Sequence, residues 1–214
     1  MASYGLTLVT APAIEPVTLD EARYQVGVPA GVDYHDTNLT RLITAAREKV
    51  ETDTGRAIIT QTWEMTIDLL PFGINALYLP RSPVQSVTYI KYYDTTNTQQ
   101  TLSTATYKTL LDREPGEIRL HWQQIWPLLY WEPGVVTVRF VAGYGDTAAN
   151  VPQSLKQALL LLIGWWFEDP TAMQTNNRTD AAYKALISRH TVGDEFHVYG
   201  RTPYRYSNTI PRMY

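Results

Sequence analysis

The chain of 214 residues contains no cysteine, which excludes disulfide bonds and zinc sites built on cysteine thiolates. The sequence is also poor in charge, because 18% of its residues are Asp, Glu, Lys or Arg, against about a quarter in an average globular protein. Neutral polar and aromatic side chains take the place of the missing charges. Since aromatic residues are enriched where protein surfaces become buried, this composition favours contact with partner chains.

Two further features are missing. The formal net charge is −3, so the chain as a whole lacks the basic field by which proteins hold nucleic acid. The most apolar run, residues 158–167, is far shorter than the ~20 residues needed to cross a bilayer. Residues 1–13 carry no Lys or Arg ahead of a weak apolar stretch, which does not match a signal peptide. We therefore expect no membrane partner.

No recognisable catalytic or metal-binding motif stands in the sequence. Serine-hydrolase, zinc-protease and phosphate-binding glycine motifs are missing, and the histidines do not form a metal-ligand pattern. Adjacent carboxylates such as Asp20 and Glu21 are typical of solvated surface. Gly143 and Gly145 are typical of a structural turn. We expect no enzyme, no metal and no cofactor.

Helical patterns occur near both ends of the chain. Thr18 followed by Glu21 is typical of a capping box at a helix start. A second helix ends at Gly55 and is predicted by apolar residues at helical spacing, namely Leu39, Leu42, Ile43, Ala46 and Val50. A third, almost wholly apolar helix follows Pro152, and a shorter fourth covers residues 179–190.

Between these helices, β-branched and aromatic residues dominate and predict an antiparallel meander. The expected fold class is α+β: a small bundle of about four helices with an inserted antiparallel β-rich subdomain and an extended C-terminal tail. The expected parts are a helical part (1–56), the β-rich insertion (57–142), a second helical part that completes the bundle (143–190) and the tail (191–214).

An aromatic cluster lies within the insertion, at Trp122, Trp126, Tyr130 and Trp131. Aromatic side chains bury large areas whatever they contact. The cluster is therefore compatible with a sugar-stacking face, as in a carbohydrate-binding module. It is equally compatible with packing at a sheet edge or at a subunit interface, and we favour these two.

The tail combines aromatic and basic residues, with no acidic residue from 196 to the end. Tyrosine and arginine often dominate protein interfaces, so we predict a partner-binding tail. Its candidate residues are Tyr199, Arg201, Tyr204, Arg205, Tyr206, Arg212 and Tyr214. A disordered terminus and a nucleic-acid-binding segment are the alternatives.

The order of these parts resembles the head–tail connector (adaptor) proteins of tailed bacteriophages, in the branch with a strand-rich insertion between two helical pairs. The resemblance rests on residues 16–22, 42–51, 54–56, 59–63, 79–84 and 140–145, and on Val151 and Pro152 leading into the leucine-rich helix with Trp165, Trp166 and Glu168. It covers about residues 11–170.

This resemblance implies a structural protein of the virion, placed at the head–tail junction after assembly in the host cytoplasm. About a dozen copies would form a ring below the portal protein and link it to the next neck, stopper or tail protein. DNA would pass through the central channel without specific binding. Leu162, Trp165 and Trp166 would then pack the bundle or form the ring interface, and the tail would bind the portal. The alternative function is a carbohydrate-binding or other virion accessory module that uses the cluster from Trp122 to Trp131.

Overall fold

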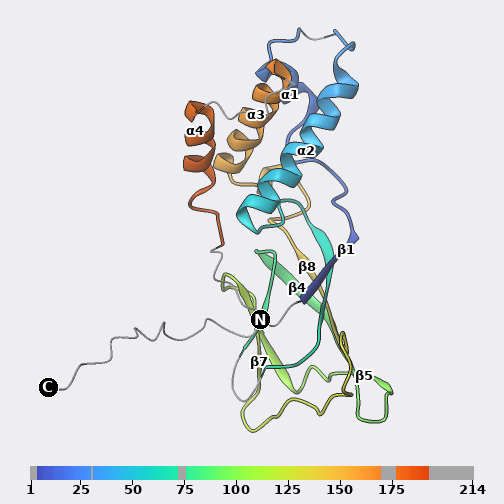
Figure 1. Cartoon of the computed structure of the whole chain (residues 1–214). Coiled ribbons are helices and arrows are strands. Elements are labelled where there is room, and N and C mark those ends of the chain that lie inside the picture. The colour runs from blue at the N-terminus through green and yellow to red at the C-terminus, as the bar shows by residue number, and fades with distance from the viewer. Residues whose placement is uncertain (1–3, 30, 72–75, 170–176, 193–214) are drawn as a thin grey trace, which may run out of the picture.

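The computed structural model describes residues 4–29, 31–71, 76–169 and 177–192 (Figure 1). Its helices are α1 (Leu19–Gln25), α2 (Asp36–Thr54), α3 (Gln153–Glu168) and α4 (Asn177–Ile187), with a 3-10 turn at Ala148–Asn150. Its strands are β1 (Tyr4–Thr10), β2 (Gln61–Ile67), β3 (Leu77–Leu79), β4 (Val84–Tyr93), β5 (Gln99–Thr101), β6 (Tyr107–Leu110), β7 (Gly116–Leu120) and β8 (Val136–Ala142). The helices gather at one end of the molecule and the strands at the other, which confirms the α+β class.

The first two helices begin and end as the sequence predicts. The Thr18 hydroxyl accepts the Glu21 backbone N–H at 3.1 Å, and the Glu21 carboxylate accepts the Thr18 N–H at 2.7 Å, so the capping box is confirmed. Helix α2 ends at Gly55, whose φ of 68° lies in the left-handed region that glycine adopts without strain. Helix α2 begins at Asp36, three residues before Leu39, which is the first of the apolar residues that predicted this helix.

The helical end has its own apolar core, formed chiefly by α2 and α3. The fully or almost fully buried side chains are Leu39, Ile43, Ala46, Val50, Leu155, Ala158, Leu159, Leu162 and Ile163. Burying each leucine or isoleucine contributes about 1.5–3 kcal/mol. Tyr183 and Ile187 of α4 join this core, so α4 packs beside α3 and continues the bundle.

All strand pairs are antiparallel, but the strands do not form the predicted meander. One sheet has the order β1-β2-β8-β4-β5 and the other has the order β3-β7-β6. The first and last strands of the insertion lie side by side, with Trp63 of β2 opposite Phe140 of β8. Strand β8 alternates buried and partly buried residues along its length, as expected of a central strand. Because Gln61 of β2 lies opposite Ala142 of β8, the start of β2 and the end of β8 are neighbours.

Strand β1 was not predicted. It lies within residues 1–56, which the sequence pattern assigned to the helical part, and pairs with β2 from Tyr4 opposite Ile67 to Thr10 opposite Thr62. Strand β1 is an edge strand, and most of its side chains are exposed. An edge strand of this kind need not show the alternation of apolar and polar residues by which a half-buried strand is recognised.

The strands enclose a second apolar core, which includes Met65, Ile67, Leu77, Leu79, Ile90, Ile118, Val136, Val138 and Phe140. Leu77, Leu79 and Ile118 come from the three-stranded sheet and the others from the five-stranded sheet, so the two sheets share one core. No helix in the described ranges is long and apolar enough to cross a membrane. The predicted tail residues, from Tyr199 to Tyr214, lie outside the described residues.

Candidate functional site

A groove of about 630 Å³ lies between α2, α3 and α4. Its apolar lining is Leu162, Trp165, Trp166, Tyr183 and Ile187, and its polar lining is Lys49, Thr52, Asp53, Asp180 and Lys184. The predicted packing or interface residues therefore come together here. Leu162 is 2% exposed and belongs to the bundle core, whereas Trp165 and Trp166 are only partly buried against that core.

The charged residues around this groove are paired within the chain. Lys49 contacts Asp53 at 2.6 Å, and Lys184 contacts Asp180 at 2.6 Å. The Tyr183 hydroxyl donates to Asp53 Oδ2 at 2.7 Å. Burial, together with this bond to the Asp53 carboxylate, raises the pKa of Tyr183 well above its usual range. The tyrosine therefore stays neutral, and the groove presents apolar ring surface between two neutralised ion pairs.

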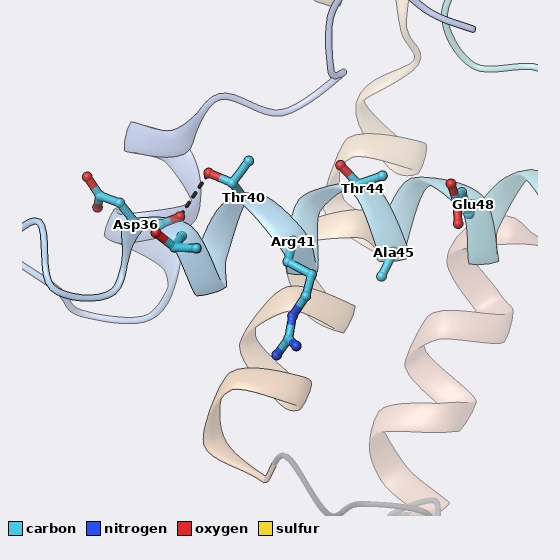
Figure 2. Close-up of a pocket in the computed structure, with 7 residues that line it drawn as sticks. Asp36, Thr40, Arg41, Thr44, Ala45 and Glu48 are labelled. Atoms are coloured by element: carbon cyan, nitrogen blue, oxygen red, sulfur yellow. Dashed lines mark hydrogen bonds between the residues drawn. The ribbon is translucent and has the colours of Figure 1, made fainter.

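A second surface is the outer face of α2, shown in Figure 2. Asp36, Thr37, Thr40, Arg41, Thr44, Ala45 and Glu48 line a shallow depression along it. Two of its hydroxyl groups already have partners, because Thr40 Oγ1 donates to the Asp36 carbonyl at 2.8 Å and Thr44 Oγ1 donates to Glu15 at 2.9 Å. Short side chains with satisfied hydroxyl groups make a helix face that another helix can approach closely.

The aromatic cluster of the insertion does not form one stacking face. Trp122 and Trp131 are 89% and 91% exposed. Trp126 and Tyr130 are partly buried and pack against the core of the sheets. The segment from His121 to Gly134, which we call the aromatic loop, therefore has an inner side that anchors it and an outer side that faces solvent.

One contact at the junction of helices and sheets has the residue types of a hydrolase site. Ser154 Oγ lies 2.7 Å from His190 Nε2, an arrangement that can activate a serine. His190 Nδ1, however, faces the Tyr144 hydroxyl at 3.5 Å, and the nearby Glu114 carboxylate accepts from Arg56 instead. Among the residues that the structure describes, no carboxylate thus orients the imidazole, which is the role of the third group in a catalytic triad.

The electrostatics of this junction also fit a structural role. Burial and the positive charge of Arg56 lower the pKa of His190, which keeps the imidazole neutral at pH 7. Within the described ranges, no cluster of three or more His, Cys, Asp or Glu side chains is placed to hold a metal ion. The contacts of His190 join the end of α4 to the start of α3 and to the chain that follows β8.

The surfaces described so far are grooves and exposed aromatic side chains, which are features of protein interaction sites. The family model of head completion proteins matches residues 30–180, and the chain belongs to this family. The resemblance to phage head–tail connector proteins is thereby confirmed. No match was found among curated proteins.

Solved structures of gene transfer agent (GTA) particles contain chains with a similar fold. A chain from the neck of an empty GTA particle, computed with C6 symmetry, has a TM-score of 0.73 and 22% sequence identity, over 92% of this chain and 99% of that chain. A chain from the virion of a native GTA particle has a TM-score of 0.72 and 22% identity, over 92% and 98%. A chain from the neck of a native GTA particle, computed with C12 symmetry, has a TM-score of 0.69 and 23% identity, over 92% and 99%.

Sequence reasoning missed the two-sided character of the aromatic loop. The side chains on its outer side, Trp122, Ile125, Leu128 and Trp131, stand three residues apart. The prediction grouped residues by aromatic character and so joined Trp126 and Tyr130, which face inward, to the two exposed tryptophans. The three-residue spacing, in a stretch without Asp, Glu, Lys or Arg, was the signal that could have separated them.

Proposed function

We propose that this chain is a head–tail connector subunit that forms a ring of about a dozen copies at the head–tail junction of a phage-like particle. The ring binds the portal protein on one side and the next neck, stopper or tail protein on the other, around a channel for DNA. The observation that carries this proposal is the match of residues 30–180 to the head completion family. The fold shared with neck chains in particles computed with C6 and C12 symmetry supports it.

A closed ring requires a heterologous contact, in which two different surfaces of the subunit meet. Two surfaces of the bundle suit such a contact. The groove lined by Trp165 and Trp166 offers partly exposed aromatic rings. The outer face of α2 offers short side chains, among them Thr44 and Ala45. We assign the lateral contact to these two surfaces, with the α2 face of one copy lying in or beside the groove of the next.

A ring at the head–tail junction also defines the roles of the C-terminal tail and of the central channel. The tail, with Tyr199, Arg201, Tyr204, Arg205, Tyr206, Arg212 and Tyr214, binds the portal. A net charge of −3 suits a channel through which DNA slides, because strong phosphate contacts would hold the DNA in place. No catalytic step is needed. The protein acts in the virion and is assembled into it in the host cytoplasm.

Electron microscopy of the protein mixed with the purified portal ring of the same particle tests this function. The proposal predicts rings of this chain bound to the portal. It also predicts that Trp166→Ser and Ala45→Arg each prevent ring formation, because each alters one side of the lateral contact. Tyr24→Ser is the matched control, since Tyr24 is a 90% exposed aromatic residue of α1 outside both surfaces.

Two outcomes count against these assignments. Failure of the unaltered protein to bind the portal in any oligomeric form would reject the connector function. Normal rings from both Trp166→Ser and Ala45→Arg would leave the function in place and reject the assigned lateral contact. Circular dichroism of each variant establishes that the loss of rings does not follow from unfolding.

A further inference from the structure

The outer side of the aromatic loop is the most exposed apolar surface of the described chain. Its four side chains are each at least 80% exposed: Trp122 (89%), Ile125 (83%), Leu128 (80%) and Trp131 (91%). Single exposed apolar residues are common, but several large ones on one short segment mark an interaction site. The loop lies at the end of the sheets that is farthest from the helices (Figure 1).

This exposure is built into the fold, because the loop is anchored along its length. His121 N donates to the Thr106 carbonyl at 3.0 Å, Tyr130 N donates to the Tyr93 carbonyl at 2.9 Å, and Gly134 N donates to Asp68 Oδ1 at 2.8 Å. Trp126, Leu129 and Tyr130 pack against the core of the sheets. With the inner side held in this way, the outer side chains cannot turn inward without breaking the core contacts of their neighbours.

The chemistry of the outer side defines its partner. No Asp, Glu, Lys or Arg occurs between Arg119 and Glu132. Nucleic acid binds through phosphate contacts to cationic side chains, which this stretch lacks. A pocket of about 220 Å³ continues this surface toward the end of β2, and its lining is Leu69, Tyr130, Trp131 and Pro133 together with Asp68 and Glu132. The outer side of the loop therefore suits a protein partner with an apolar surface.

The available area is that of a specific protein contact. The two tryptophans alone can bury roughly 300–500 Å². A standard interface buries about 800 Å² on each partner, so Trp122 and Trp131, with Ile125 and Leu128 between them, supply most of one. Tryptophan is also among the residues that most often dominate binding energy at interfaces.

The nearest polar element at this end of the sheets is not a suitable partner for the loop. The turn between β4 and β5, which lies at the same end of the sheets as the loop, consists of the polar residues Asp94, Thr95, Thr96, Asn97 and Thr98. A neighbouring copy that brought this turn against the loop would bury polar groups, among them the Asp94 carboxylate, against apolar side chains.

We propose that the aromatic loop binds an apolar cleft on the neck protein that follows this ring on the side away from the portal. This inference rests on the connector function proposed above. The portal contact is assigned to the tail (191–214), and near its start Val192 N donates to the Thr54 carbonyl at the base of the helical bundle. The loop lies at the opposite end of the sheets and is free for the second axial partner (Figure 1).

The double variant Trp122→Gln/Trp131→Gln tests this inference in the full chain. Its affinity is measured by surface plasmon resonance for two probes, the purified downstream neck protein and the purified portal ring of the same particle. The matched control is Tyr24→Gln/Tyr34→Gln, because these tyrosines are 90% and 86% exposed and lie at the helical end. We expect at least tenfold weaker binding of the double tryptophan variant to the neck protein, with ring formation and portal binding unchanged, and no loss in the control.

Each other outcome has a defined meaning. Unchanged binding to the neck protein, or an equal loss in the tyrosine control, overturns the inference. Loss of ring formation would instead make the loop a contact between copies, and selective loss of portal binding would make it a portal contact. Glycan binding by the unaltered chain that disappears in the variant would make it a sugar site. If the unaltered chain forms no ring and binds no portal, the connector function itself fails.

Discussion

Arg56, the residue that follows the last turn of α2 and Gly55, forms an ion pair with Glu114 in the turn between β6 and β7. Arg56 Nη1 donates to Glu114 Oε1 at 2.7 Å, and Arg56 Nη2 bonds the second carboxylate oxygen. The same guanidinium donates to the His190 carbonyl and lies over the Tyr144 ring. A single side chain thus connects the helical bundle, the three-stranded sheet and the end of α4.

Replacing the two partners of this ion pair should have unequal effects. Arg56 is 6% exposed and serves three segments, so Arg56→Met should lower the free energy of unfolding by about 3 kcal/mol. The Glu114 side chain is 46% exposed, and Glu114→Gln should cost no more than about 1 kcal/mol. Urea unfolding of the two variants measures both values. Equal losses would show that the bonds of Arg56 to His190 and Tyr144 contribute little.

A buried pair inside the bundle gives a second prediction. Arg47 donates to Glu51 Oε2 at 3.0 Å and to Glu15 Oε2 at 2.8 Å, and Glu51 Oε1 accepts the Ile58 N–H at 2.8 Å. Burial raises the pKa of Glu51, an effect that Arg47 opposes. Arg47→Met leaves this carboxylate buried without its cation and should destabilise the protein by about 3 kcal/mol.

The neighbouring variant Glu48→Gln is the control for Arg47→Met. Glu48 is exposed and lies 3.8 Å from Arg47, at the outer limit of an ion pair, so its change should stay within about 0.5 kcal/mol. A destabilisation below about 1 kcal/mol in Arg47→Met, measured by thermal unfolding, would contradict the account of the buried pair.

His190 makes the stability of the junction sensitive to pH. Burial and the charges of Arg56 and Arg189 lower its pKa, although Glu114 acts in the opposite direction. The unfolded chain therefore binds the proton more readily than the folded chain does, and stability rises with pH in the range between the two pKa values. The stability that the neutral His190 gives is fully present above the ordinary histidine pKa of 6.5. It is lost as the pH falls below 6.5 toward the lowered pKa of His190 in the folded chain.

We expect His190→Gln to reduce the loss of stability between pH 6.5 and pH 5. Chemical unfolding of the variant and of the unaltered protein at a series of pH values checks this. If the two curves fall in parallel, His190 does not carry the pH dependence.

Gly143 gives a prediction about the backbone where β8 returns to the helices. Its φ is 138°, and a Cβ atom there would lie 2.6 Å from the backbone of Ile59 and Thr60. Gly143→Ala should therefore destabilise the protein by at least about 2 kcal/mol. Gly5→Ala is the matched control, because its Cβ would lie in ordinary contact 3.8 Å from Thr66. Similar melting temperatures for the two variants would contradict the close approach.

The helices could be predicted well because their signals are local. The Thr18 capping box, the apolar spacing from Leu39 to Val50 and the stop at Gly55 each lie within a few turns of the residues that they specify. The α+β class followed from the change of composition near residue 57.

The sheet topology could not be predicted, because strand partners are chosen by packing between distant segments. Trp63 and Phe140 lie opposite each other although 77 positions separate them in the printed sequence. An edge strand such as β1 gives no clear apolar alternation. For the candidate site, the sequence pattern identified Leu162, Trp165 and Trp166, which line one groove. The same pattern could not separate the outward-facing residues of the aromatic loop from the inward-facing ones.

The most direct measurement for the central claim is the location of this chain in the particle. Cryo-electron microscopy of the intact particle, with the chain carrying a small added domain at its N-terminus, would show where the extra density lies. The connector function predicts a ring of extra density at the head–tail junction, directly below the portal. Extra density on the capsid surface or at the distal end of the tail, with none at the junction, would contradict it.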